Sequence, residues 1–254
     1  MNYLRLDIHI LALAALALAF SANTAAAQQS GMHYRQSINM PPGAIGHEQL
    51  LRGGPLPGYF QPVEITVPDG GAISLVVDGN FDDPQPARRL AAMLIGPVYR
   101  FRVSSIPKHP GLEVYPTIEV VNRLYPPLGM ELRFPIQIEL TQEELVLASR
   151  GNMVTRVIYL EDPEQALPAR QNNGRQSWFD AAAGDDPLRV ADGLGRPMAI
   201  LRIGGLVPQA GQSDAAFLYG APPLMLFGGA DGKQPLGITG SVPECVEPGQ
   251  SEEQ

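Results

Sequence analysis

The pattern of apolar and polar positions changes character at Tyr59. Residues 28–58 carry single apolar residues among Gly, Pro, Gln and Ser, with no sustained period of 2 or 3.6. Residues 59–205 instead contain short runs in which apolar and polar residues alternate, and Gly and Pro separate these runs. Such alternation is typical of half-buried strands. We therefore predict a loosely ordered leader over 28–58, followed by one mainly β domain over 59–205.

Seven short strands are predicted within this domain. The alternation is strict from Tyr99 to Val103, where Tyr99, Phe101 and Val103 would share a face opposite Arg100 and Arg102. Frequent short strands favour a β-sandwich or an open barrel-like fold over a parallel α/β sheet. The predicted strands are 60–67, 72–78, 98–103, 114–124 with an edge or bulge at Pro116, 131–140 interrupted at Pro135, 153–160 and 197–203.

Turn and helix signals fall between these strands. The turn 68–71 (PDGG) predicts a hairpin that joins the first two strands. Thr141 and Glu144 have the spacing of a capping box, and Gly151 supplies a left-handed end for the helix that follows. The residues at 90, 93 and 94 predict a second short helix before Gly96-Pro97, and Asp186-Pro187 predicts a helical turn over 188–191.

The first 27 residues have the order of a secretory signal peptide. Arg5 precedes an apolar stretch over 8–20, and the segment ends in Ala25-Ala26-Ala27. We predict cleavage after Ala27 and export to the periplasm or the extracellular space, with no membrane span in the mature chain. The apolar stretch is shorter than the roughly 20 residues that a spanning helix needs. An uncleaved, membrane-anchored helix is the alternative.

The chain ends in a Gly/Pro-rich, acidic tail over 206–254, which we predict to be mostly disordered, with 217–227 touching the body. The single cysteine, Cys245, lies in this tail between Glu244 and Val246. We interpret it as a free thiol; the alternative is a disulfide between two chains.

Composition narrows the functional classes. Gly (27) and Pro (25) are abundant and charged residues make up 17%, which excludes a coiled coil or a long-helix protein. The net charge of −8 argues against nucleic-acid binding, which needs a basic face. One cysteine excludes a disulfide framework and any site with several cysteine ligands.

Several stretches resemble an uncharacterised family of exported bacterial proteins of the planctomycete type. The resemblance covers about 96–168, implies export and one compact domain, and carries no known activity or catalytic residue. The stretches are GPVYRFRV at 96–103, HPGLEVYPTIE at 109–119, FPI at 134–136, LTQEEL at 140–145 and VTRVIYLEDP at 154–163.

One segment suggests a cation site. Asp78, Asn80 and Asp82 have the 1, 3, 5 spacing of oxygen ligands in a calcium loop, but position 6 is Asp83 and position 12 is Arg89, where Gly and Glu are required. Either a cation site of another geometry or a solvated acidic turn fits this pattern.

Signatures of catalysis are lacking in the sequence. His33, His47 and His109 form no metal-binding pair, and neither a nucleophile elbow nor a nucleotide-binding glycine pattern is present. We therefore predict no cofactor and assign no catalytic residue. A pairing of His109 with Glu113 would require the fold to bring them together.

Two pairs of residues are candidates for binding. Arg100 and Arg102 share one strand face and either bind an anionic group, or are solvated or paired with a glutamate on a neighbouring strand. Trp178 and Phe179 lie in a polar segment and either anchor a partner or a sugar, or pack back onto the domain.

These observations lead to two hypotheses. The first is an exported, non-enzymatic β-rich module that binds other proteins or cell-envelope material through its loops. The second is a secreted hydrolase or lyase whose carboxylate and histidine site assembles only in the fold.

Overall fold

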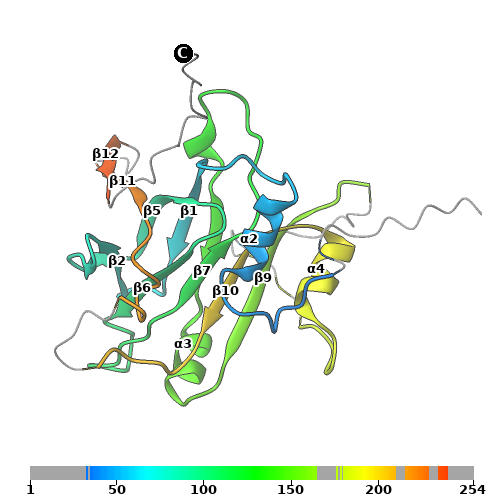
Figure 1. Ribbon diagram of the computed structural model, residues 1–254. Helices are drawn as coiled ribbons and strands as arrows, with labels where there is room; N and C mark the ends of the chain where they lie inside the picture. Colours follow the sequence, from blue (N-terminus) through cyan, green and yellow to red (C-terminus); the bar gives the residue numbers. More distant parts are fainter. Residues whose placement is uncertain are drawn as a thin grey trace, which may run out of the picture. The chain divides into compact units, whose positions relative to one another are not determined.

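The computed structural model describes residues 33, 35–164, 176, 178, 180–209, 215–228 and 234–239, which belong to one compact unit (Figure 1). The predicted signal peptide and Cys245 lie outside the described residues. No helix in the described ranges has the length and apolar character that crossing a membrane requires.

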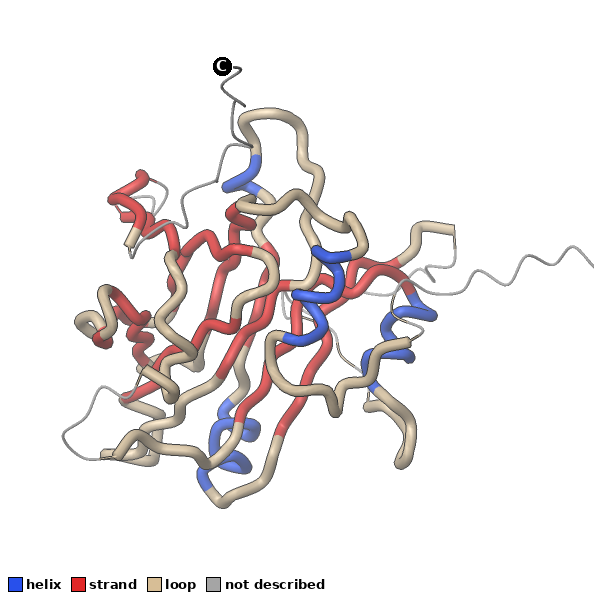
Figure 2. Tube along the Cα trace, viewed as in Figure 1, coloured by secondary structure: helices blue, strands red, loops and turns tan. Residues whose placement is uncertain are grey.

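The described strands form two sheets, so the prediction of a mainly β domain is confirmed (Figure 2). The first sheet has the order β12-β11-β5-β1-β8, and β1 and β8 in it run parallel. The second has the order β3-β2-β6-β7-β10-β9, with β4 also paired to β2. The bounds in the first sheet are β12 (Gln234–Ile238), β11 (Leu224–Gly228), β5 (Arg88–Leu94), β1 (Phe60–Thr66) and β8 (Ile136–Glu139). Those in the second are β3 (Asn80–Phe81), β2 (Ala72–Val77), β4 (Gln85–Pro86), β6 (Val98–Ser104), β7 (Thr117–Val120), β10 (Gly195–Ile203) and β9 (Val154–Glu161).

The main core lies between the sheets and draws on both. Val63 and Ile65 of β1 face it from the first sheet, while Phe101 of β6, Ile118 of β7 and Leu201 of β10 face it from the second. All five are completely buried, as the alternation along each strand predicts. In β6 the predicted faces are confirmed, since Tyr99, Phe101 and Val103 belong to this core.

The predicted hairpin over 60–78 is wrong, although both of its strands exist. β1 pairs with β5 and β8, whereas β2 pairs with β3, β4 and β6. The turn after Val67 therefore carries the chain from one sheet to the other. Turn chemistry reverses the chain direction, but it does not fix which strand becomes the neighbour.

The predicted helix before Gly96 is also wrong, because this segment is strand β5. Ala91 and Met93 face the main core, while Leu90 and Ala92 pack with Phe227 on the opposite face. A central strand that is buried on both faces has no period-2 pattern, and apolar residues on consecutive positions then imitate a helical spacing.

Two predicted strands are shorter than expected. Residues 131–133 form a 3-10 helix, η1 (Glu131–Arg133), and the strand begins only at Ile136, after Pro135. β7 likewise begins only at Thr117, directly after Pro116, but it lies between β6 and β10, and its register with β6 continues to Val114, so the edge or bulge expected at that proline is wrong.

Two of the three described α-helices agree with the sequence analysis. α3 (Gln142–Ser149) has the predicted capping box, and Gly151 after it has a φ of 87°. α4 (Pro187–Leu194) begins with Asp186, whose side chain accepts a hydrogen bond from the Leu188 amide. Asp and Ser/Thr side chains satisfy amides that a helix start leaves unpaired.

The prediction of a loosely ordered leader is wrong for its described part, because α2 (Ala44–Leu51) packs onto the second sheet (Figure 1). Ile45 of α2 is completely buried and contacts Val121, Leu188 and Ile200. The helix is only eight residues long and lies in a Gly/Pro-rich stretch, so its own periodicity gives no signal, and tertiary contacts stabilise it.

The prediction of a mostly disordered tail is wrong for part of its length. β11 pairs with β5 and β12 pairs with β11, which extends the first sheet beyond residue 205. The expected contact of 217–227 with the body is confirmed, since Phe227 packs against Leu90. The side chain of Tyr99 also donates a hydrogen bond to the Pro223 carbonyl at 2.8 Å.

Candidate functional site

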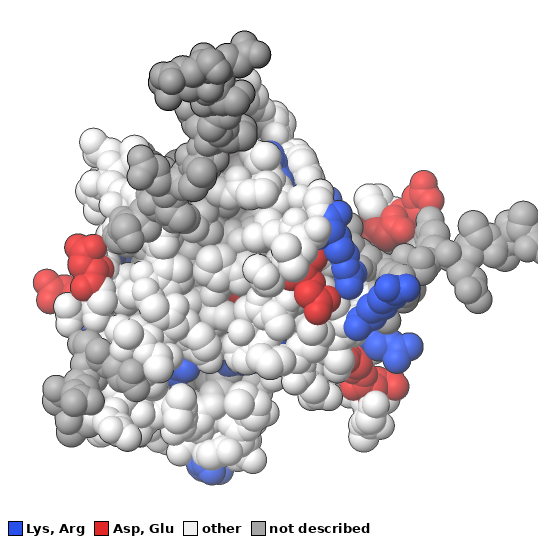
Figure 3. Space-filling view, in the orientation of Figure 1, with Lys and Arg blue, Asp and Glu red and all other residues white. Residues whose placement is uncertain are grey.

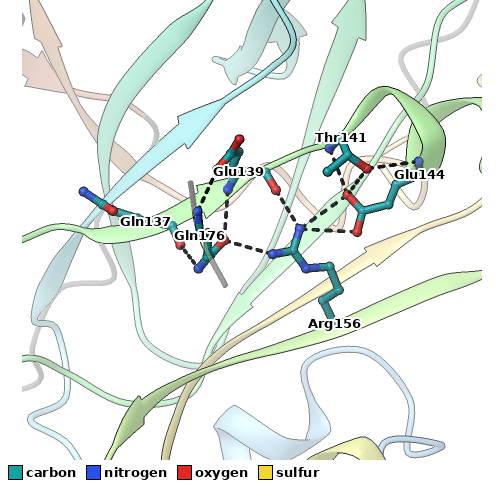
Figure 4. A network of polar contacts seen from close by, with 6 residues as sticks. All are labelled: Gln137, Glu139, Thr141, Glu144, Arg156 and Gln176. Carbon is teal, nitrogen blue, oxygen red and sulfur yellow. Dashed lines mark hydrogen bonds and ion pairs between the residues drawn. The ribbon is translucent and has the colours of Figure 1, made fainter. Parts of the chain in front are cut away.

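On one side of the domain, the edge strands of the two sheets, β8 and β9, lie near each other; both are edge strands among the described residues. Arg156, on β9, reaches across this side to β8, and its Nη1 donates to the Glu139 carbonyl at 2.6 Å (Figure 4). Alternation along β9 explains this direction, because Ile158, two positions on, faces the main core. The arginine thus links two sheets at a place where no described strand joins them.

Gln176 lies against β8 and binds it through both ends of its side-chain amide. Its Nε2 donates to the Gln137 carbonyl at 3.0 Å, and its Oε1 accepts from the Glu139 amide at 3.3 Å. The Gln176 backbone amide also donates to Glu139 Oε2 at 3.0 Å, and Arg156 Nη2 donates to Gln176 Oε1 at 2.9 Å (Figure 4). The Gln176 side chain therefore covers backbone groups at the edge of β8.

Glu144 completes this network from α3. Its Oε2 accepts a hydrogen bond from the Thr141 amide at 2.9 Å, and its own amide donates to the Thr141 hydroxyl oxygen at 3.3 Å, which together form the capping box. The Thr141 hydroxyl also donates to Oε2 at 2.9 Å. The same carboxylate forms an ion pair with Arg156 at 3.3 Å, with both side chains 16% exposed. A carboxylate at a helix start also interacts favourably with the helix dipole. Glu144 therefore holds the helix start and the arginine in one arrangement.

A hollow of about 330 Å³ opens on the outer face of β9, and we call it the tryptophan hollow. Trp178 lines it with 61% of its surface exposed, and Val157, Tyr159 and Val190 add apolar lining. Glu143 and Asp180 carry acidic groups at its wall, beside the Arg156–Glu144 pair. This is where the structure places the tryptophan of the predicted binding pair; Phe179 lies outside the described residues.

A second hollow, of about 650 Å³, lies beside β8, and we call it the tyrosine hollow. Tyr125 and Phe134 line it, with 64% and 50% of their surfaces exposed, together with Leu160 and three prolines. Its charged lining residues are Arg133 and Arg196. The two hollows share Ile158, Tyr159 and Gln176 as lining residues, so they lie next to each other on either side of the network.

Two arginines lie against Tyr125 of the tyrosine hollow, and one of them also lies against Tyr59. The Arg123 guanidinium lies 4.1 Å from the ring centre of Tyr59 and 4.5 Å from that of Tyr125. Arg196 lies 5.4 Å from the Tyr125 ring centre. These distances fall within the range of cation–π attraction. They orient Tyr125 while leaving much of its surface exposed.

Tyr159 lies at the junction of the two hollows. Burial, together with the nearby Glu161 carboxylate, raises the pKa of Tyr159 above its ordinary value of 10.0. Its phenol therefore keeps its proton at neutral pH and can donate a hydrogen bond as well as accept one.

The predicted arginine pair lies on another part of the molecule. Arg100 is buried with its guanidinium 4.1 Å from the Phe217 ring centre and 5.2 Å from that of Tyr219, and this burial lowers its pKa. Arg102 forms an ion pair with Glu113 at 3.6 Å. Aromatic side chains of the same chain thus cover the first arginine, and the second pairs with a glutamate, which was the other expectation for this face.

The predicted cation ligands form a turn. Asp78 and Gly79 both have positive φ, 48° and 79°, and join β2 to β3 as a two-residue hairpin loop. Asp82 accepts a hydrogen bond from the Leu75 amide at 2.7 Å and forms an ion pair with Arg89; burial nevertheless raises its pKa. No cluster of three or more His, Cys, Asp or Glu side chains suited to a metal occurs in the described ranges. These residues therefore belong to an acidic turn at the β2–β3 hairpin.

The histidines are dispersed over the described fold. His33 is buried, and its ring contacts Gln36 and Gln49. Burial is the main reason that its pKa is lowered, against the opposing effects of Gln36 and Asp192. His47 is exposed on α2, and His109 lies in a turn where its amide bonds to the Ile106 carbonyl at 3.0 Å. None of the three lines either hollow.

Sequence reasoning missed most of this site. Trp178 gave a signal because it forms an aromatic pair with Phe179 in a polar segment, but Gln176 has nothing in its type or spacing that marks it. Tyr125 and Phe134 each precede a proline in an irregular segment, where no periodicity predicts a face. Arg156 is one of 16 arginines, and only its register on β9 directs it to β8.

Comparisons with protein-family models, with curated proteins and with solved structures found no match for this chain. The resemblance to the exported planctomycete-type family therefore stays a prediction.

Proposed function

We propose that this protein is an exported binding module that holds another protein or cell-envelope material on the tryptophan and tyrosine hollows. The binding surface would comprise both hollows and the network of Arg156, Glu144 and Gln176 between them. The signal-peptide pattern of residues 1–27 and the resemblance over 96–168 support export.

The observation that carries this proposal is the grouping of exposed apolar side chains. Single exposed apolar residues are normal on any surface, but a contiguous group around a concavity indicates an interaction site. Here Trp178, Tyr125, Phe134 and Leu160 are all exposed and line two adjacent hollows. Aromatic anchors beside a fixed charged network are the usual composition of a binding hot spot.

Few charged side chains line the tyrosine hollow. Its charged lining residues are Arg133 and Arg196, among mainly apolar ones. Most of the face drawn in Figure 3 likewise carries no Lys, Arg, Asp or Glu side chain, as expected from the 17% share of charged residues in the chain. Apolar contact is therefore the main expected source of affinity in this hollow.

The hydrolase or lyase alternative would place its carboxylates in a hollow. Glu143, Glu144 and Asp180 do line the tryptophan hollow. Glu144, however, is held by Thr141 and by Arg156, which explains its position as part of the helix start. The exposed aromatic residues have no such structural explanation, so binding remains the function that we propose.

A pull-down from envelope extracts tests the proposal. The purified protein is compared with a Trp178→Ala, Tyr125→Ala double variant, and we expect recovery of the bound material to fall at least tenfold. The matched control is Leu51→Ala, Leu236→Ala, which removes two equally exposed apolar side chains from α2 and β12. Equal recovery by all three proteins would refute the proposed surface.

A further inference from the structure

We infer that the edge of β8 accepts an extended peptide segment of the partner as an added strand, with an apolar side chain in the tyrosine hollow and an acidic side chain near Arg133 and Arg196. This inference rests on the proposed function and narrows its partner to a polypeptide.

The direction of the backbone groups on β8 supports strand addition. The Leu140 amide donates to the Thr66 carbonyl of β1 at 2.8 Å. Because successive residues of a strand direct their backbone groups to opposite sides, Gln137 and Glu139 direct theirs away from β1. Among the described strands, β8 is the last in its sheet, so this side of it meets no further strand.

Gln176 occupies this edge as a short substitute for a strand. A neighbouring strand would offer one N–H and one C=O to the Gln137 carbonyl and the Glu139 amide. The side-chain amide of Gln176 offers the same pair of groups, at 3.0 Å and 3.3 Å. The second distance is near the long end of the hydrogen-bond range. Arg156 also donates to Gln176 Oε1 at 2.9 Å and to the Glu139 carbonyl at 2.6 Å, so an added strand displaces the glutamine side chain and pairs beside this arginine.

The tyrosine hollow lies where the side chain of an added strand would point. Strand addition takes its affinity from main-chain hydrogen bonds and its specificity from pockets for alternate side chains. Ile136, Ile158 and Met198 give the hollow an apolar floor next to Gln137. Its charged lining residues are both cationic, which favours an acidic residue two positions from the apolar one, because alternate residues of a strand share a face.

A glycan is the competing occupant, since aromatic side chains also stack on sugars. A sugar, however, has no reason to require the specific donor and acceptor pair that Gln137 and Glu139 present. The bound amide of Gln176 is a peptide-like group, and it shows which chemistry this edge accepts. We therefore assign the edge to a polypeptide.

The experiment uses the purified protein and an acetylated, amidated peptide of the sequence Ser-Val-Ser-Glu-Ser-Val-Ser, in which Val and Glu share one face of the strand. Affinity is measured by titration, and exchange of the Glu139 amide hydrogen is followed by NMR. We expect saturable binding that slows this exchange. In a Gln176→Ala variant the free protein exchanges the Glu139 amide faster, and the peptide binds roughly tenfold more tightly because it no longer displaces the three hydrogen bonds of the Gln176 side chain.

Two controls make the result specific to the backbone of β8. A Gln85→Ala variant removes an exposed glutamine from β4 in the other sheet, and its affinity should equal that of the unchanged protein. A peptide methylated on alternate backbone nitrogens keeps its side chains but loses donors, and it should bind at least tenfold more weakly.

Three outcomes would overturn the inference. These are equal binding of the methylated peptide, unchanged Glu139 exchange on binding, and absence of peptide binding to both the protein and its Gln176→Ala variant. In each of these cases the Trp178→Ala, Tyr125→Ala variant can still lose recovery in the pull-down. The proposed binding function would then hold, but the bound partner would not be an added strand. Binding of soluble peptidoglycan fragments without peptide binding would identify that occupant as a glycan.

Discussion

Glu119 of β7 and Arg202 of β10 form a buried ion pair between neighbouring strands. Arg202 Nη1 lies 2.9 Å from Glu119 Oε2, and the Glu119 side chain has no exposed surface. The other carboxylate oxygen, Oε1, accepts a hydrogen bond from the Gly46 amide of α2 at 2.8 Å. One carboxylate therefore fastens α2 to the second sheet, which explains how a segment without its own periodicity becomes part of the fold.

Glu119→Gln should destabilise the protein by about 3 kcal/mol, because it leaves the buried Arg202 without its counter-charge. The free energy of unfolding in urea measures this effect. Glu64→Gln is the matched control, since Glu64 pairs at 3.6 Å with an Arg88 side chain that is 62% exposed. That change should cost under about 1 kcal/mol. Similar losses in both variants would contradict a special role for the buried pair.

Gly46→Ala should destabilise the protein by about 1–3 kcal/mol through overpacking. A Cβ at this position would lie 2.7 Å from the Gly96 Cα and 3.2 Å from the Val120 carbonyl oxygen, and both are backbone atoms that move only with the strands. Gly193→Ala in α4 is the control, because its Cβ would meet nothing within 4 Å. It should leave stability unchanged or raise it by up to about 1 kcal/mol. Thermal unfolding distinguishes the two, and an unaffected Gly46→Ala would show that α2 does not pack tightly.

Stability should decrease as the pH falls below about 6.5, owing to His33. Burial lowers the pKa of His33 in the folded protein, so the unfolded chain binds the proton first and acid favours unfolding. The slope from this one group is at most about 1.4 kcal/mol per pH unit, between 6.5 and the lowered pKa. Urea unfolding from pH 5 to 8 measures it. His33→Asn should lose this slope and His47→Asn should keep it; a slope that survives in His33→Asn has another source.

Arg156→Met should destabilise the protein by about 2 kcal/mol, since it removes charge-assisted hydrogen bonds and leaves Glu144 unpaired. It should also speed amide exchange at Glu139, because Gln176 loses the arginine that positions it. Arg52→Met is the control, as its pair with Glu48 is exposed and is expected to contribute under about 0.5 kcal/mol. Unchanged exchange at Glu139 in Arg156→Met would show that the arginine does not position Gln176 at the edge of β8.

Local signals in the sequence were sufficient where one face or one cap decides the structure. The alternation around Phe101 and the capping box of Thr141 and Glu144 predicted β6 and α3, because each depends on neighbours in the chain. β5 and α2 were missed because their environment decides them: β5 is buried on both faces, and α2 is held by Glu119. The pairing of β1 with β5 and β8 was missed because the turn after β1 does not specify which strand becomes its neighbour.

The same distinction between local signals and distant contacts applies to the candidate site. Trp178 was predicted from its unusual setting, whereas Gln176 and Arg156 meet β8 only through the arrangement of two sheets. The arginine pair was assigned to the correct strand face, but nothing in the sequence showed that Phe217, more than a hundred residues away, would cover Arg100. Contacts between distant segments set the function of these residues.

The most direct test of the account is hydrogen–deuterium exchange of the protein with and without the material recovered from envelope extracts. We predict slower exchange at residues 137–139 and around Trp178 on binding, with the pairing of β11 and β12 unaffected. Protection confined to α2 or to the β11–β12 edge, with β8 and Trp178 unchanged, would contradict it.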